Sequence, residues 1–128
     1  MAPDRALLGI VLAGGAHAPA HAAFSFAAAA AAMGRRVVLF ATAGGVRALC
    51  RDWSGLAGAG RDALLTGRGL AGLDELREAA LALEARLVAC EAALRGEGIG
   101  PDALLAGVAA GGIVSFLEEI GGGQLLSF

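Results

Sequence analysis

Cys90 is the residue of this chain that best fits a reactive role. It closes the apolar run Leu87-Val88-Ala89 and precedes a short helical segment that begins at Glu91. A thiol at the start of a helix is exposed to the positive end of the helix dipole, which favours the reactive thiolate form. Glu91 opposes this effect, whereas a nearby arginine such as Arg95 would support it. The residues alone leave two interpretations open, a reactive thiol and a small buried apolar cysteine.

The second cysteine and the two histidines offer weaker chemistry. Cys50 falls in the predicted second crossover helix and is interpreted as a packing residue, with a redox partnership with Cys90 as the alternative. His17 and His21 have a spacing that would place both on one helix face as metal ligands. Pro19 between them predicts instead that His17 lies in the loop before the helix, so we expect no metal.

Two glycine pairs could bring backbone amides close to an anion. Gly14-Gly15 and Gly44-Gly45 each follow a predicted strand, at the sheet edge where open parallel sheets bind their ligands. Neither pair forms a dinucleotide-binding or P-loop motif, so a tight turn is the default interpretation. The binding candidates at this edge are His17, Gly45 and Arg47. No Ser-His-Asp set, paired carboxylates or CxxC motif is apparent.

Apolar runs bounded by glycine alternate along the chain with segments of helical period. This alternation is typical of a parallel sheet covered on both faces. Strands are predicted at 7–13, 36–42, 86–90 and 124–128, with a fifth, short strand around 105–110. Helices are predicted at 18–33, 73–84 and 113–120, with a short helix starting at Pro101. With right-handed crossovers this order predicts an α/β fold of three layers, α/β/α, around a mainly parallel five-stranded sheet.

Two segments depart from ordinary solvent-facing elements. The alanine-rich helix at 18–33 is apolar all round, so we expect it to be buried against the sheet and at a contact between copies of the chain. Segment 52–71 is rich in glycine, contains Trp53 and has no clear period. Long connectors of this kind are usually lids or mobile segments, so we predict a mobile loop with a packed turn at 63–65.

Length and composition exclude several classes of protein. The chain has 128 residues, of which 57% are hydrophobic, and it carries two cysteines and a net charge of −2. These values predict one domain over residues 1–128 and exclude a disordered chain or a disulfide scaffold. The charge balance gives no basic footprint, so direct binding to nucleic acid is not expected.

Cysteine usage and hydropathy bear on the compartment. Two cysteines without a disulfide or zinc pattern fit a reducing compartment, and a cytoplasmic location is expected. A secretory signal is the alternative, with an apolar core at 7–12 and the small-x-small pattern of a cleavage site at Ala16-His17-Ala18. Glycines, histidines and Pro19 interrupt the long uncharged run, so no membrane span is predicted.

A series of segments, in order and at matching spacing, carries a likeness to a known family. In the first half they are Phe24-Ser25-Phe26-Ala27, Met33-Gly34-Arg35-Arg36-Val37-Val38-Leu39-Phe40 and Ala41-Thr42-Ala43-Gly44-Gly45-Val46. In the second half they are Val88-Ala89-Cys90-Glu91-Ala92-Ala93-Leu94-Arg95-Gly96 and Gly107-Val108-Ala109-Ala110-Gly111-Gly112 with Phe116-Leu117. Over nearly the whole chain they resemble the DsrE/DsrF/TusD-like sulfur-relay (DsrE-like) family.

The resemblance implies a sulfur carrier with sulfurtransferase-like activity. Members carry sulfur as a persulfide on one cysteine, which corresponds to Cys90 here, between sulfur-donor and acceptor proteins. It also implies a homo-oligomer, a trimer or hexamer, and no cofactor. The chain departs from the family pattern at Glu91, at Ala41 and Ala43 in place of an aromatic pair, and in the length of segment 52–71.

Two other functions remain open from the sequence. One is a non-catalytic oligomeric module that binds a small ligand or anion at the same sheet edge. The other is a structural subunit of a sulfur-relay complex. Reactivity of Cys90 separates both from a sulfur carrier.

Overall fold

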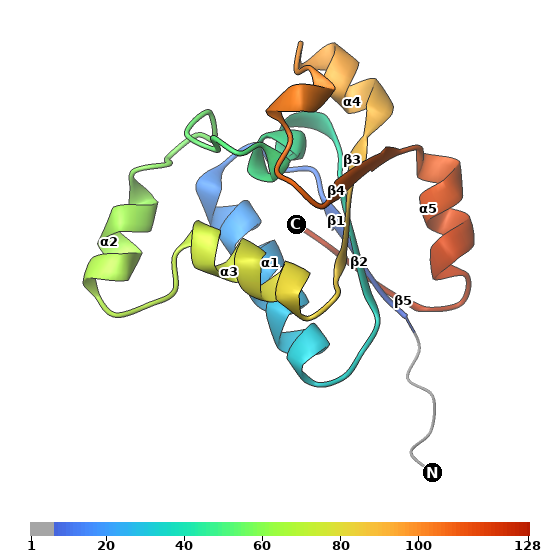
Figure 1. Ribbon diagram of the computed structural model, residues 1–128, viewed down its shortest axis with the longest axis horizontal. Coiled ribbons are helices and arrows are strands. Elements are labelled where there is room, and N and C mark those ends of the chain that lie inside the picture. Colours follow the sequence, from blue (N-terminus) through green and yellow to red (C-terminus); the bar gives the residue numbers. More distant parts are fainter. Residues whose placement is uncertain (1–6) are drawn as a thin grey trace.

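The computed structural model describes residues 7–128, in which five strands form one parallel sheet (Figure 1). The strands are β1 Leu8–Leu12, β2 Val37–Ala41, β3 Arg86–Cys90, β4 Val108–Gly111 and β5 Gln124–Ser127. Their order is β4-β3-β2-β1-β5, and every neighbouring pair is parallel. The predicted α/β class and five-stranded sheet are confirmed. The predicted domain 1–128 includes residues 1–6, which lie outside the described residues.

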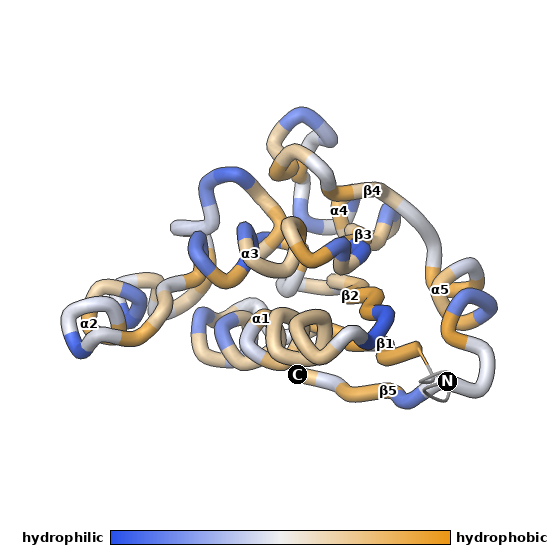
Figure 2. The backbone as a smooth tube through the Cα atoms, turned by 60° about the horizontal axis from the view of Figure 1, so that its bottom comes forward, coloured by the Kyte–Doolittle hydropathy of each residue, from blue (hydrophilic) through white to orange (hydrophobic). Residues whose placement is uncertain are grey.

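Helices cover both faces of the sheet and make three layers (Figures 1 and 2). Helices α1 (His17–Ala32) and α3 (Leu73–Ala82) cover one face, and α5 (Ile113–Ile120) covers the other. The remaining elements are η1 (Ala43–Leu49), α2 (Arg61–Gly67), α4 (Glu91–Gly96) and η2 (Pro101–Ala103). The predicted helices agree with α1, α3 and α5 within one or two residues, and the predicted second crossover helix is the 3₁₀ segment η1.

The three central strands are apolar apart from Arg86, the exposed first residue of β3, because both their faces are buried. Residues of β1, β2 and β3 alternate between the two layers, as the pleat requires. Leu8, Ile10, Leu39 and Leu87 lie in the core under α1 and α3. A smaller cluster under α5 contains Val38, Phe40, Val88, Cys90, Phe116 and Ile120.

Gly9 lets α5 pack closely against the sheet. A Cβ at this position of β1 would lie 2.1 Å from Ile120 Cδ1, well inside van der Waals contact. Because glycine has no side chain, Ile120 at the end of α5 can rest directly on the backbone of the central strand. The helix therefore lies close enough to bury the cluster that contains Cys90.

Helix α1 begins earlier than Pro19 predicts. The structure starts the helix at His17, so the prediction that His17 lies in the preceding loop is wrong. Pro19 is the third helical residue, and proline is tolerated in a first turn because the amide it lacks would have no partner within the helix. The buried residues of α1 recur at helical spacing and pack on the sheet: His17, Ala20, Ala23, Phe24, Ala27, Ala30 and Ala31.

Segment 52–71 is partly helical rather than an unstructured loop. Helix α2 contains the predicted turn at 63–65, but none of its residues is buried, and Figure 1 shows it standing away from the sheet. The segment is tied to the start of α1, where Ala57 N–H donates to Gly15 O at 3.0 Å and His17 N–H donates to Ala57 O at 2.8 Å. The mobility of this segment stays a prediction.

Hydropathy of the helices gives one negative finding. Within residues 7–128, no helix combines the length and apolar character needed to span a bilayer.

Candidate functional site

Cys90 is the last residue of β3 and the N-cap of α4. This is the carboxyl end of a parallel strand, where loops gather the reactive groups of open α/β sheets. The predicted position of Cys90 between strand and helix is confirmed. Cys90 therefore lies at the sheet edge where such reactive groups are found. The helix that follows it, α4, is short, with six residues.

The thiol of Cys90 is covered. Cys90 is only 2% exposed and belongs to the apolar cluster under α5. Phe116 of α5 and Phe40 of β2 stack within this cluster with ring centroids 4.8 Å apart. A reagent can therefore reach Cys90 only when α5 or its neighbours move.

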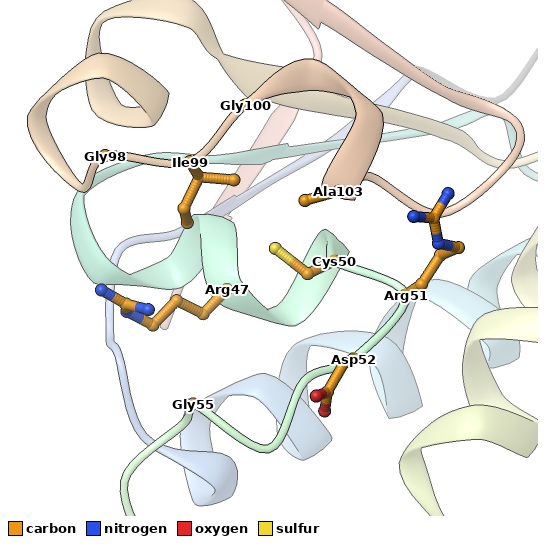
Figure 3. A pocket seen from close by; sticks show the side chains of 9 residues that line it. All are labelled: Arg47, Cys50, Arg51, Asp52, Gly55, Gly98, Ile99, Gly100 and Ala103. Carbon is orange, nitrogen blue, oxygen red and sulfur yellow. The ribbon is translucent and has the colours of Figure 1, made fainter.

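Arg47 and Cys50 line a separate pocket (Figure 3). The cavity has a volume of about 330 Å³ and lies between the end of η1 and loop 98–103. Figure 3 shows the Cys50 side chain between Arg47 and Arg51, with Ile99 and Ala103 on the facing wall. The complete lining is Arg47, Cys50, Arg51, Asp52, Gly55, Gly98, Ile99, Gly100 and Ala103.

The surroundings of Cys50 act on its protonation in opposite directions. Burial raises the pKa of the Cys50 thiol above its ordinary value, while the guanidinium groups of Arg47 and Arg77 lower the pKa in part. Asp52 raises it further. The thiol Sγ lies 3.8 Å from Val46 O, its hydrogen-bond acceptor. Both cysteines are free, and the Cys90 cluster does not include Cys50.

Arg77 fixes the wall that carries Cys50. Its guanidinium is 3% exposed and donates to Ala48 O at 3.1 Å, to Cys50 O at 2.5 Å and to Arg51 O at 3.4 Å. It also pairs with Asp74 at 3.0 Å. A buried arginine needs such partners, and here they satisfy the carbonyls at the end of η1.

Gly45 has a packing role in the structure. It lies in η1, and a Cβ there would come within 2.2 Å of Leu12 O. The neighbouring glycines pack closely as well, since a Cβ on Gly44 would lie 3.0 Å from Gly15 Cα. The two glycine pairs therefore let the loops after β1 and β2 touch. Anion binding by Gly45 stays a prediction.

His17 lies in a polar cluster on the α1 face. It is fully buried, with Nε2 at 2.7 Å from Asp62 Oδ1, and its ring stacks on His21 with centroids 5.5 Å apart. Asp62 also accepts from Leu73 N–H at 2.8 Å, and His21 Nε2 lies 2.9 Å from Ala71 O. Both histidines thus hold segment 52–71 against α1. No group of three or more metal-ligating side chains occurs among the described residues.

The structure therefore divides the predicted site residues. Arg47 and Gly45 share η1, Cys90 is buried under α5, and His17 is buried under segment 52–71. Cys50 was expected as a packing residue, and it is buried but also lines the pocket beside Arg47. In the sequence, the pattern that could have indicated this pocket is a cysteine at position 50 between arginines at positions 47 and 51.

Comparison with family models gives one match. The model described as "DsrE/DsrF-like family" matches residues 7–128, which is every residue that the structure describes. The match covers both halves of the chain, including the segments around residues 90 and 107–117 that carry the likeness in the sequence. A search of curated proteins found no match.

Comparison with solved structures supports the fold. The chain is similar to the ychN protein from E. coli, with a TM-score of 0.71 and 17% identity over 97% of this chain and 99% of the other. It is also similar to MTH1491, a protein of unknown function from Methanobacterium thermoautotrophicum, with a TM-score of 0.63 and 21% identity. That match covers 96% of this chain and 99% of the other.

Proposed function

The chain belongs to the DsrE/DsrF-like family, and from this premise we propose that it accepts sulfur as a persulfide on Cys90 and passes it to a partner protein. Family membership supports a role of sulfur-relay type, with partner proteins that give and take sulfur. The single observation that carries the finer proposal is the place of Cys90, at the carboxyl end of β3 and directly before α4.

Both steps of the relay are thiol exchanges and need no external oxidant. The Cys90 thiolate attacks the outer sulfur of a donor persulfide, R–S–SH, and a new sulfur–sulfur bond forms on Cys90 as the donor bond breaks. The donor leaves as a thiolate and takes up a proton. In the second step an acceptor thiolate attacks the outer sulfur on Cys90, and Cys90 leaves as the thiolate.

Burial of Cys90 suits a carrier that must protect its cargo. A persulfide on an exposed cysteine would lose its sulfur to any small thiol, since exchange depends on access. In this chain Phe116 and the rest of α5 shield the thiol from solvent. Helix α5 lies between two glycine caps, Gly112 before it and Gly121 after it, and Gly121 has a φ of +54°. We expect docking of a donor or acceptor protein to shift α5 and open the site.

The test is the mass of the intact protein before and after incubation with a persulfide donor, without reductant. The wild type and the Cys50→Ser variant should each gain the mass of one sulfur atom, and reductant should remove it. Cys90→Ser should gain none. Loading of Cys90→Ser to the same extent as the wild type, or no loading of any form, would contradict the proposal.

The compartment is part of this proposal. Persulfide transfer requires thiols that are not locked in disulfides. Both cysteines of the chain are free, which supports a reducing compartment such as the cytoplasm. Partners carrying reactive thiols would share that compartment.

A second candidate function is favoured by the pocket beside Arg47. A non-catalytic module would bind a small ligand there without using Cys90, and the cavity of about 330 Å³ is within the usual size of ligand pockets. Under this function Cys90→Ser leaves ligand binding intact. Loss of binding in Cys90→Ser would exclude it.

A further inference from the structure

The pocket between η1 and loop 98–103 has fixed walls. Cys50 and Leu104 form an antiparallel bridge, in which Arg51 N–H donates to Ala103 O at 2.9 Å and Leu105 N–H donates to Leu49 O at 2.8 Å. Arg77 holds the carbonyls of residues 48, 50 and 51 from behind. Because both walls are tied, the cavity is formed before any ligand arrives, which lowers the free-energy cost of binding.

Two arginines give this pocket an affinity for negative charge. Arg47 and Arg51 line it on either side of Cys50 (Figure 3). Asp52 also lines the cavity, and its carboxylate accepts from Ser54 N–H at 2.9 Å. Among residues 7–128, Arg47 forms one ion pair, with Glu97 at 3.8 Å between Nε and Oε1, and its side chain is 38% exposed. This contact is long for a charge-assisted hydrogen bond, so the guanidinium keeps donors for a ligand.

Cys50 places a thiol at the wall of this cavity. It is the only thiol in the lining, and the facing wall of Ile99, Gly100 and Ala103 carries no side-chain charge. The pocket thus combines a thiol, two guanidinium groups and apolar walls in about 330 Å³. That combination fits a small molecule with carboxylates at its ends and sulfur in its middle.

We propose that this pocket binds small carboxylate-bearing organic disulfides and that Cys50 forms a mixed disulfide with them. The carboxylates pair with Arg47 and Arg51, which brings the disulfide against the thiol. The Cys50 thiolate attacks one sulfur of R–S–S–R, the bond between the two sulfurs breaks, and a Cys50–S–S–R bond forms. The other half leaves as R–S⁻ and takes up a proton, so the electrons balance without a further oxidant. The site is independent of sulfur transfer at Cys90.

The test compares an anionic and a neutral disulfide on the folded protein. Oxidised glutathione and 2-hydroxyethyl disulfide are the probes, and intact mass with peptide mapping gives the rate and place of modification. Wild type and Cys90→Ser should gain one glutathione half at Cys50, and Cys50→Ser should not. Arg47→Gln and Arg51→Gln should each lower the glutathione rate by about fivefold, the effect of one unit charge at about 4 Å in water.

The neutral probe and a distant arginine provide the controls. The rate with 2-hydroxyethyl disulfide should stay unchanged in Arg47→Gln and Arg51→Gln. Arg68→Gln, at the C-cap of α2 and outside the pocket lining, should leave both rates unchanged. Circular dichroism of each variant checks the fold. The proposal is overturned if oxidised glutathione modifies Cys90 rather than Cys50, or if the arginine variants slow both probes equally. Because persulfide loading of Cys90 is measured separately, failure here leaves the relay proposal standing.

Discussion

At the scale of single residues, two cysteines of the same chain receive different surroundings. Cys90 is 2% exposed among apolar side chains under α5, and Cys50 is 7% exposed beside a cavity with two arginines. The first environment keeps the thiol away from solvent, and the second places two guanidinium groups at the same cavity as the thiol. We therefore predict that the two cysteines react with different reagents, and not only at different rates.

Substitution of Gly45 tests its packing role at the same scale. In Gly45→Ala the new Cβ would meet the backbone carbonyl of Leu12 at 2.2 Å, so η1 must move away from β1. We expect the free energy of unfolding in urea to fall by about 3 kcal/mol, as for overpacked cores. Gly96→Ala is the matched control, because no atom lies within 4 Å of its Cβ. Equal stability of the two variants would show that η1 does not depend on this close contact.

Asp62 predicts a pH dependence of stability. Burial raises the pKa of Asp62, but the hydrogen bonds from His17 and from Leu73 N–H outweigh it and hold the pKa below the ordinary value. A carboxylate with a lowered folded-state pKa stabilises the fold above its unfolded pKa of about 4, and this contribution is lost as the pH falls through the lower folded value.

The measurement is urea unfolding of wild type and Asp62→Asn across pH. The wild type should be the more stable at neutral pH. The difference should shrink as the pH falls from about 4, where the carboxyl group of the unfolded chain takes up its proton, and it should vanish once the pH is below the lower folded-state pKa of Asp62. Glu78→Gln on the exposed side of α3 serves as the control, because it removes one carboxylate that is exposed to solvent. A difference between wild type and Asp62→Asn that stays constant down to acid pH would assign the effect to shape rather than charge.

At the scale of elements, strands and helices were predictable and their contacts were not. Strands β1 and β2 are apolar runs of five residues, β3 has four apolar residues after Arg86, and α3 has a clear apolar face, so local pattern sufficed. The candidate sites depend on distant partners instead. Cys90 lies under α5, the pocket of Cys50 is closed by loop 98–103, and His17 pairs with Asp62 45 residues away. Neither spacing nor period carries that information.

The packing of α5 over Cys90 controls how fast a reagent reaches the thiol in our prediction. Phe116 is 4% exposed and shares the cluster of Cys90, so Phe116→Ala removes part of the cover. We expect the rate of alkylation of Cys90 by iodoacetamide to rise by about tenfold, because each 1.4 kcal/mol taken from the cost of opening is a factor of ten. The background should be Cys50→Ser, so that only one thiol reacts.

Two further variants separate opening of α5 from loss of the fold. Leu117→Ala lies on the exposed side of the same helix, with Leu117 53% exposed, and should leave the rate unchanged. Phe116→Leu keeps most of the volume and should raise the rate less than alanine does. Fast alkylation of Cys90 in the wild type, at the rate of an unfolded control, would mean that α5 is no barrier.

At the scale of the whole molecule, apolar surface remains uncovered on the α5 side. Ile113, Val114 and Leu117 of α5 are 53%, 69% and 53% exposed, and Leu125 of the edge strand β5 is 49% exposed. Single apolar residues on a surface are ordinary, but several on one short helix indicate a contact. The sequence placed the expected contact between copies on the alanine-rich helix, where Phe26 is 52% exposed and lies against Phe128.

The expected homo-oligomer gives these surfaces a direct test. Light scattering at rising concentration should give a mass three or six times that of one 12.6 kDa chain, as the family resemblance implies. If α5 forms the contact, Val114→Glu should raise the dissociation constant by about a hundredfold, because a buried unpaired charge costs several kcal/mol. Phe26→Glu should do so if α1 forms it. Leu64→Glu on α2, where Leu64 is 64% exposed, adds the same charge away from both surfaces and should leave the assembly intact. A single-chain mass at every concentration would contradict the oligomer. In that case α5 alone would cover Cys90, and a sulfur donor would have to displace α5 without help from a neighbouring copy.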